Sequence, residues 1–256
     1  MKIPVLSLDN KPVEEIELPK IFETPIRPDI IKKAVIVQQS HNFQPQGRDP
    51  MAGKRTTAES WGVNRGLSRV PRLRDSRRAA FGVSTVKGHQ AFPPTSKKRI
   101  AMKIGVKERR LAICSGIAAT IVRDLVEGRG HILESISQLP IVVEDNIQSL
   151  KKTKDVKDFL KNFGLWLDVE RCIKRKTRAG RGKTRGRRNR VGKGPLIIVC
   201  NDEGISKACA NIPGVDVVKL HDLNAELLAP GAIPGRLVVW SKSALLGLND
   251  FWGGLI

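Results

Sequence analysis

The chain has 256 residues, of which 40% are hydrophobic and 4% aromatic, and it contains no tyrosine. This composition suffices for one modest hydrophobic core, but not for a core that includes every position. The formal net charge is +21 and the pI is about 10.3. Such a balance indicates a polyanionic partner, because cations gain affinity for nucleic acid by releasing its condensed counterions.

The positive charge is concentrated in two segments. Seventeen Lys or Arg but only four Asp or Glu lie between residues 47 and 110, and twelve Lys or Arg with no acid lie between residues 171 and 193. The rest of the chain carries slightly more acids than bases. We therefore expect an ordinary globular body with two intensely basic appendages.

Cysteine usage and hydropathy exclude a secreted or membrane-spanning protein. No cysteine belongs to a C-x-x-C pair, which predicts buried free thiols in a reducing compartment. No secretory signal is visible, and the longest apolar run, residues 111–122, is too short to span a bilayer. We expect a soluble cytoplasmic protein that does not associate with membranes.

In chain order, the first predicted elements are a hairpin and a helix. Alternating apolar residues predict strands around 3–8 and 13–18, and Pro28 opens a helix that continues to Val37. From residue 41 to 95 neither a period of 2.0 nor one of 3.6 residues persists. A structureless stretch of that length is functional, disordered or both, so we predict a long extended basic loop over residues 41–100.

The second half of the chain alternates helices and strands. One helix is expected from Val106 to Leu125, and further expected elements are a strand at 140–143, helices around 156–162 and 165–174, and strands at 196–200, 215–220 and 236–240. Strands that are apolar on both faces and alternate with helices predict a mainly parallel sheet. The predicted fold class is α/β: a single Rossmann-like globular domain, residues 1–256, interrupted by the loop 41–100 and by a basic RNA-binding segment, 171–194.

Nucleotide-binding and catalytic motifs are absent from the sequence. GRGKT at 180–184 resembles the end of a phosphate-binding loop, but Thr177 stands where the first Gly is needed and no strand leads into it. A dinucleotide fingerprint fails because Arg185 replaces its third Gly. Glu144-Asp145 and Asp202-Glu203 follow predicted strands, and we interpret them as helix caps rather than catalytic groups. The four histidines show no metal spacing, so we predict no metal, no cofactor, no catalytic residue and no small-molecule substrate.

The two basic segments predict RNA binding. Glycines between the cations allow the backbone to approach a phosphate chain, and the Arg fork pairs with phosphate oxygens. RNA is favoured over DNA because no helix-turn-helix, zinc finger or basic zipper is present. In the loop, Trp61, Phe81 and Phe92 could stack on unpaired bases.

Several motifs resemble one known family. AESWG (58–62), Arg69-Val70-Pro71-Arg72, AFG (80–82) and AFPPTSKK (91–98) resemble, in the same order, the family of the fourth protein of the large ribosomal subunit, archaeal and eukaryotic type. RAGRGKTRGRR (178–188) followed by GPLIIV (194–199) resembles its second signature. The chain lacks the long C-terminal extension of eukaryotic members and therefore resembles the archaeal type.

This resemblance implies a structural constituent of the large ribosomal subunit, not an enzyme, that supports subunit assembly. Its expected partners are large-subunit rRNA, neighbouring large-subunit ribosomal proteins and, at the loop tip, the nascent polypeptide in the exit tunnel. The tip would be formed by Arg69, Pro71, Arg72 and Arg74. The expected rRNA-binding residues are Arg48, Lys54, Arg55, Trp61, Arg65, Arg77, Arg78, Lys87, Lys97, Lys98 and Arg99 in the loop, and Arg175, Lys176, Arg178, Arg181, Lys183, Arg185, Arg187, Arg188 and Arg190 in the second segment.

One alternative remains open at this stage. An RNA-processing or RNA-modifying enzyme with basic arms would share the charge pattern. It would need a clustered catalytic or cofactor site, which the sequence does not show.

Overall fold

The structure is a computed structural model that describes residues 2–252, with side chains as far as residue 249. The chain divides into two compact units: a body, residues 1–39 and 103–256, and an insertion, residues 40–102. In chain order the elements are β1 (Lys2–Leu6), β2 (Pro12–Glu17), η1 (Lys20–Glu23), α1 (Pro28–Ser40), α2 (Val106–Ala118), α3 (Arg123–Gly128), β3 (Ile141–Val143), η2 (Asp145–Ser149), α4 (Thr153–Asn162), α5 (Trp166–Ile173), β4 (Lys176–Thr177), η3 (Gly180–Gly182), β5 (Asn189–Arg190), β6 (Leu196–Val199), α6 (Ile205–Cys209), β7 (Asp216–Lys219), η4 (Leu220–Asp222), α7 (Ala225–Leu228), η5 (Pro230–Ala232), β8 (Val238–Ser241) and α8 (Lys242–Trp252).

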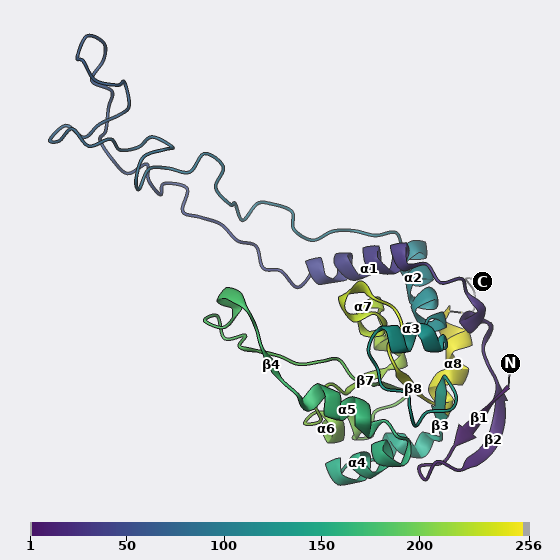
Figure 1. Cartoon of the computed structure of the whole chain (residues 1–256). Coiled ribbons are helices and arrows are strands. Elements are labelled where there is room, and N and C mark those ends of the chain that lie inside the picture. Colours follow the sequence, from purple (N-terminus) through teal and green to yellow (C-terminus); the bar gives the residue numbers. More distant parts are fainter. Residues whose placement is uncertain (1, 253–256) are drawn as a thin grey trace. The chain divides into compact units, whose positions relative to one another are not determined.

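The body is built on a six-stranded, mainly parallel sheet (Figure 1). The strand order is β2-β1-β3-β8-β6-β7, and only the β1–β2 pair is antiparallel. This confirms the predicted α/β class, the N-terminal hairpin and the membership of the 140–143 strand in the same sheet. The last strand, β8, lies between β3 and β6, so the order differs from the 3-2-1-4-5-6 order of the dinucleotide-binding fold.

Both faces of the sheet are buried at its centre, where β3 and β6 carry apolar side chains at every position and β8 at all but its last. Leu196 and Ile198 of β6 belong to one hydrophobic cluster, with η1, α1, α2, α7 and α8, whereas Ile197 and Val199 belong to a second, with α3, α4, α5 and α6. Successive side chains of a strand point to opposite faces, so one apolar run supplies both cores. Trp240 of β8 is fully buried in the first cluster and meets Phe22 edge-to-face, with ring centroids 5.9 Å apart.

The helix predicted from Val106 to Leu125 is wrong as a single element. The structure has two helices, α2 and α3, separated by residues 119–122. In that gap the buried Thr120 hydroxyl donates to the Ile117 carbonyl at 2.7 Å, and Val122 is extended, with ψ of 107°. A hydroxyl that bonds the preceding turn competes with the helical ladder, which a purely apolar pattern does not reveal. The other predicted elements of the body are confirmed in type and order, with ends that differ by a few residues.

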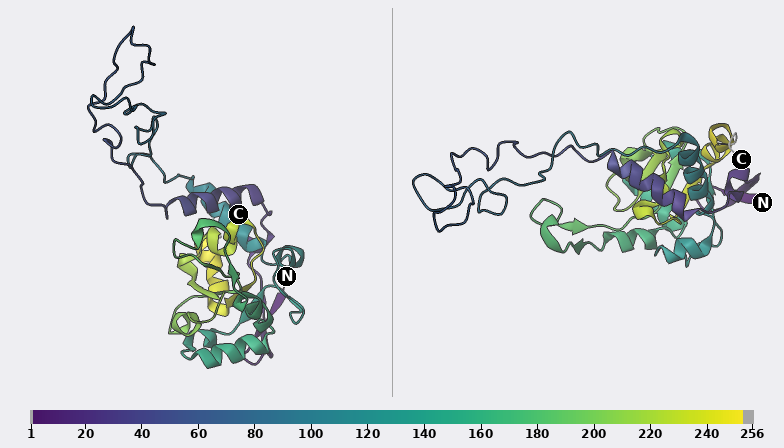
Figure 2. Two further views of the ribbon diagram at one scale, coloured as in Figure 1. Left: turned by 60° about the vertical axis from the view of Figure 1, so that its left-hand side comes forward. Right: turned by 90° about the horizontal axis from the view of Figure 1, so that it is seen from above.

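The insertion contains no helix or ladder of its own between residues 41 and 101, among the residues described. Its ends are tied to each other: Met102 N donates to Ser40 Oγ at 2.9 Å, and the His41 ring bonds the Met102 carbonyl at 3.0 Å. Further along, Arg48 N donates to Pro94 O at 3.0 Å. The two arms of the insertion therefore run side by side, as both views of Figure 2 show.

No helix in the part of the chain that the structure describes has the length and apolar character needed to cross a bilayer.

Candidate nucleic-acid interface

The basic segment 171–194 forms a hairpin. β4 pairs antiparallel with β5, and Arg178 N donates to Arg188 O at 2.8 Å just beyond the strands. Gly180 and Gly186 adopt φ of +76° and +79° in the connecting turn, a conformation that favours glycine. Like charges at neighbouring positions repel, yet the segment pairs with itself, because main-chain hydrogen bonds close the ladder while the cationic side chains remain exposed.

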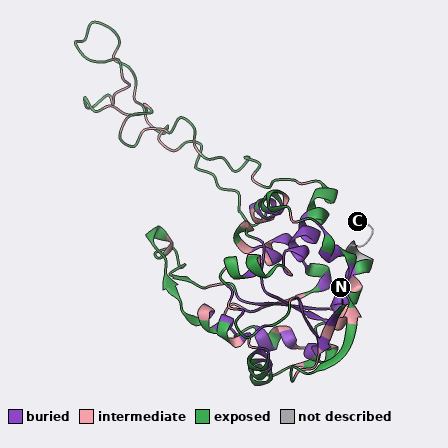
Figure 3. Ribbon diagram, turned by 45° about the vertical axis from the view of Figure 1, so that its right-hand side comes forward, coloured by how far each residue is buried: buried purple, intermediate pink, exposed green. Residues whose placement is uncertain are grey.

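All nine predicted cations of the hairpin are exposed to solvent (Figure 3). The ion pairs in this region involve the residues that flank the hairpin, Arg171 and Lys193, and not the cations between them, among the residues described. Their charge is therefore available to an external anion. An exposed two-stranded ladder with glycines in its turn can present such side chains to phosphates on both sides.

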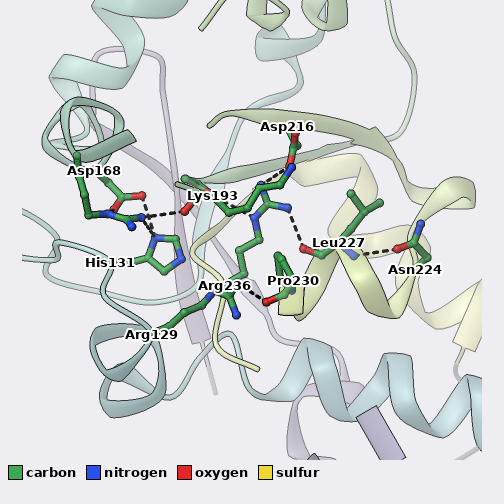
Figure 4. Close-up of polar contacts among 11 residues, drawn as sticks. Arg129, His131, Asp168, Lys193, Asp216, Asn224, Leu227, Pro230 and Arg236 are labelled. Atoms are coloured by element: carbon green, nitrogen blue, oxygen red, sulfur yellow. Dashed lines mark hydrogen bonds and ion pairs between the residues drawn. The ribbon is translucent and has the colours of Figure 1, made fainter. Parts of the chain in front are cut away.

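A buried arginine holds the descending end of the hairpin in the body. Arg236 is 0% exposed and donates to the Gly194 carbonyl at 3.0 Å, to the Leu227 carbonyl at 2.9 Å and to Asp216 Oδ2 at 2.6 Å (Figure 4). Lys193 Nζ lies 3.0 Å from the same Asp216 oxygen. One carboxylate thus forms ion pairs with two cations where the hairpin enters the sheet.

A buried carboxylate holds the ascending end. Asp168 of α5 is 0% exposed; its Oδ2 lies 2.8 Å from His131 Nδ1, and its Oδ1 accepts from Arg171 Nε at 2.9 Å (Figure 4). Arg171 Nη2 then donates to the Lys193 carbonyl at 2.8 Å. The guanidinium of Arg171 therefore joins the two ends of the hairpin to each other.

Burial and charge set the pKa values in this network. Burial is the largest effect on both carboxyls and opposes ionisation, but His131 and Arg171 outweigh it at Asp168, and Arg236 and Lys193 outweigh it at Asp216, so both pKa values are lowered. Burial is also the main reason why the pKa of His131 is lowered. His131 is therefore neutral, donates from Nδ1 to Asp168, and keeps Nε2 buried without a partner.

Arg129 extends the network by donating from Nη2 to the Pro230 carbonyl at 2.7 Å and from Nη1 to the Ile233 carbonyl. Burial, with the nearby Arg236 and Arg171, lowers the pKa of Arg129 to about 10. It still carries its charge at neutral pH.

The sequence analysis did not predict the residues that hold the two ends of the hairpin in place. His131, Asp168, Asp216 and Arg236 lie far apart in sequence and meet only because the sheet and α5 bring them together. The one available signal is Arg236 itself, a cation directly before an apolar strand, which needs a partner once it is buried.

Two of the four carboxylates predicted to be helix caps, Asp145 and Asp202, accept hydrogen bonds at helix N-termini, whereas Glu144 accepts from the Asn146 amide. Asp202 Oδ1 accepts from Gly204 N at 3.0 Å and Ser206 N at 3.2 Å, at the start of α6. Asp145 Oδ1 accepts from Ser243 N at 2.9 Å and from Ser243 Oγ at 2.6 Å, at the start of α8. The N-terminus of α8, where an α/β fold can bind phosphate, thus already has an internal carboxylate.

In the insertion, the predicted tip residues lie in a compact turn region, residues 59–79, which is closed by backbone bridges. Arg72 forms bridges with Glu59 and with Ala79, and its guanidinium donates to Ser68 Oγ at 2.9 Å and to the Arg77 carbonyl at 2.5 Å. Arg72 and Pro71 are half-buried, whereas Arg69 and Arg74 are exposed. Arg72 therefore stabilises this turn region, and Arg69 and Arg74 are the predicted tip cations that are exposed to solvent.

The other predicted cations of the insertion are exposed, and Trp61 is half-buried. The exposed residues are Arg48, Lys54, Arg55, Arg65, Arg77, Arg78, Lys87, Lys97, Lys98 and Arg99. Arg55 is paired with Asp49, and Arg74 lies 3.5 Å from Glu59. Phe92, one of the three aromatic residues proposed for stacking, is 92% exposed, as expected for a side chain that packs on a partner.

Comparison with known proteins decides the family. A sequence model of the ribosomal protein L4/L1 family matches residues 16–251, nearly the whole chain. The chain belongs to the ribosomal protein L4/L1 family. Within this L4/L1 family, it is 50% identical over 252 residues to the large ribosomal subunit protein uL4 of Methanosphaera stadtmanae, covering 98% of this chain and 97% of that protein.

Two further L4/L1 relatives show the same near-complete match. Large ribosomal subunit protein uL4 of Archaeoglobus fulgidus is 48% identical, covering 98% of this chain and 99% of that protein. The protein of the same name from Saccharolobus solfataricus is 46% identical, covering 97% and 94%. The relatives are archaeal, which confirms the predicted archaeal type.

Proposed function

We propose that this protein is a structural constituent of the large ribosomal subunit that binds large-subunit rRNA and supports subunit assembly. One observation carries the proposal: a nearly neutral α/β body belonging to the L4/L1 family presents two segments of exposed, largely unneutralised cations. Such cations let RNA segments that repel each other approach closely. The proposed role is to neutralise the charge of RNA phosphates and to position RNA segments, and it includes no enzymatic reaction.

Within this proposal, each part of the chain has its own role. The body anchors the protein on the subunit, beside neighbouring ribosomal proteins. Its likeness to Rossmann folds is limited to the layering of helices on a mainly parallel sheet. Residues 41–100 act as an extended loop among rRNA segments, and the hairpin of residues 171–194 grips rRNA near the body.

The tip of the loop, with Arg69 and Arg74 exposed, contributes to the wall of the polypeptide exit tunnel and contacts the nascent chain. The protein therefore resides on cytoplasmic ribosomes. The family membership and the exposure of these two cations support this assignment.

Sedimentation of cell extract tests the proposal. We expect the protein to comigrate quantitatively with large subunits and to remain there after a high-salt wash, because many phosphate contacts and ordered segments hold it. The rival function, an RNA-processing or RNA-modifying enzyme, predicts a free pool that turns over RNA. A mainly free protein would refute the structural role.

A further inference from the structure

The insertion contains a cavity to which the proposed function assigns no role. It has a volume of about 250 Å³, and its apolar wall includes Leu73, Ala79, Ala80, Phe81 and Val86. Drug-sized ligands occupy clefts of roughly 300–1,000 Å³, so this cavity suits something smaller, of the size of a single planar ring system. Phe81 and Val86 are at least partly exposed, so the apolar wall is open to a ligand from outside.

Cations surround this apolar wall. Arg55, Arg78 and Lys87 line the cavity together with the apolar residues, and no acid does. Arg55 is paired with Asp49, whereas Arg78 and Lys87 have no carboxylate within ion-pair distance among the residues described. The ligand should therefore combine an apolar planar part with negative charge on its rim.

The backbone around the cavity is held in unusual conformations. Phe81 and Lys87, both lining residues, have φ of +67° and +62°, which non-glycine residues rarely adopt. Gly53, another lining residue, has no room for a side chain, because a Cβ there would lie 2.6 Å from the backbone of Gly88. Such conformations persist where surrounding structure over-determines them, and they concentrate at ligand clamps.

We propose that this cavity binds one unpaired nucleotide of the RNA, with its base against Phe81 and the apolar wall and its phosphates on Arg78 and Lys87. The inference rests on the proposed RNA-binding function and deepens it. Proteins recognise RNA mainly at loops and bulges, where an unstacked base can be turned outward onto an aromatic ring. A purely electrostatic loop would need cations but no apolar wall between them.

The test compares two RNA probes with the full-length protein. One is a fluorescein-labelled RNA hairpin with a single unpaired adenosine bulge, and the other is the same hairpin without the bulge. We expect fluorescence anisotropy to show about tenfold tighter binding of the bulged hairpin, the effect of one stacked base at the lower end of its range. Equal affinity for the two probes would overturn the inference while leaving RNA binding intact. Failure to bind either probe would instead count against the proposed function.

Matched variants separate the cavity from general charge. Ala80→Trp fills the cavity without changing the charge, so it should abolish the preference while retaining affinity for the paired hairpin. Phe81→Leu removes the aromatic face without adding volume and should reduce the preference even if Ala80→Trp distorts the insertion. The double variant Arg78→Gln/Lys87→Gln should weaken the bulged complex more than the paired one.

Lys97→Gln/Lys98→Gln provides the control, because it removes the same charge from exposed residues outside the cavity. It should weaken both complexes equally. An undiminished preference in both Ala80→Trp and Phe81→Leu would refute the assignment. So would displacement of the bulged hairpin, but not of the paired one, by an apolar, acidic peptide, which would assign the cavity to a protein partner.

Discussion

At the level of single residues, Arg236 and Asp216 link the hairpin to the sheet. Arg236 is wholly buried and donates to two backbone carbonyls besides Asp216. Removing Asp216 would leave the Arg236 charge buried without compensation, whereas removing Arg236 leaves its two carbonyl acceptors without a donor. These two residues lie twenty positions apart and meet only through the pairing of β6 with β7 and β8, so sequence periodicity could not predict the contact.

Arg236→Met should lower the free energy of unfolding by about 2–4 kcal/mol, because two carbonyls lose their donor and Asp216 keeps only the half-exposed Lys193 as a cationic partner. Urea denaturation of the full-length protein measures this loss. Lys33→Met is the control: Lys33 is about half exposed and its partner Glu108 is too, so the salt bridge it loses contributes at most about 1 kcal/mol. A loss below about 1 kcal/mol for Arg236→Met would contradict the role assigned to it.

His131, Asp168 and Asp216 make the free energy of unfolding depend on pH. A pKa that is lower in the folded state means that the unfolded chain binds more protons, so stability rises with pH across that window. As the pH falls below about 6.5, the ordinary value for histidine, His131 should begin to destabilise the fold. Below about 4, protonation of Asp168 and Asp216 should add a second loss.

His131→Asn tests the first of these two losses. The asparagine amide can still donate to Asp168 but does not titrate. Urea midpoints measured between pH 7 and pH 5 should fall for the wild-type protein and change less for the variant. An identical pH dependence in both proteins would exclude His131 as its source.

At the level of elements, the hairpin 171–194 predicts a specific salt dependence. Each lysine or arginine that displaces a counterion contributes about 0.7–0.9 to the slope of log affinity against log salt. Arg181→Gln/Lys183→Gln/Arg185→Gln should therefore reduce the slope for purified large-subunit rRNA by about 2–3. Filter binding across a salt series provides the measurement.

The matched control removes three lysines from α4, using Lys154→Gln/Lys157→Gln/Lys161→Gln. These side chains are exposed, as those of the hairpin are, but lie on α4, outside both basic segments. The control should leave the slope nearly unchanged. Equal slope changes in both triple variants would mean that net charge matters and the hairpin does not.

The elements also show what sequence could and could not predict. The apolar runs at 196–200 and 236–240 determine two-sided strands, and the structure contains both. The gap between α2 and α3 escaped prediction because it depends on one buried hydroxyl, that of Thr120. The backbone pairing of β4 with β5 escaped because side-chain charge says little about main-chain hydrogen bonds. The candidate RNA-binding cations could be predicted from the distribution of charge along the chain. Asp168 and Asp216, which hold the ends of the hairpin, could be identified only once the fold was known.

At the level of the whole molecule, we expect very unequal resistance to protease. The insertion and the hairpin have many exposed Lys and Arg, whereas the buried hydrophobic residues lie in the body (Figure 3). Limited trypsin digestion of the free protein should cut first within residues 48–99 and 174–193 and leave the body intact. Mass spectrometry of the fragments identifies the sites.

Large-subunit rRNA should protect the same two segments. Because exposed cations become covered by phosphates, cleavage in the bound form should slow at these sites and remain unchanged in the body. Equal resistance in the free and bound forms would contradict ordering of the segments on RNA.

The hydrogen bonds between Ser40, His41 and Met102 close the insertion at its base. Closing a long chain segment costs only about 2–3 kcal/mol more than closing a short turn, because the cost grows with the logarithm of length. The length of the insertion can therefore vary with little effect on the free energy of folding. Selection can lengthen or shorten it to suit the distance to be reached within the particle, while the domain that bears it stays the same.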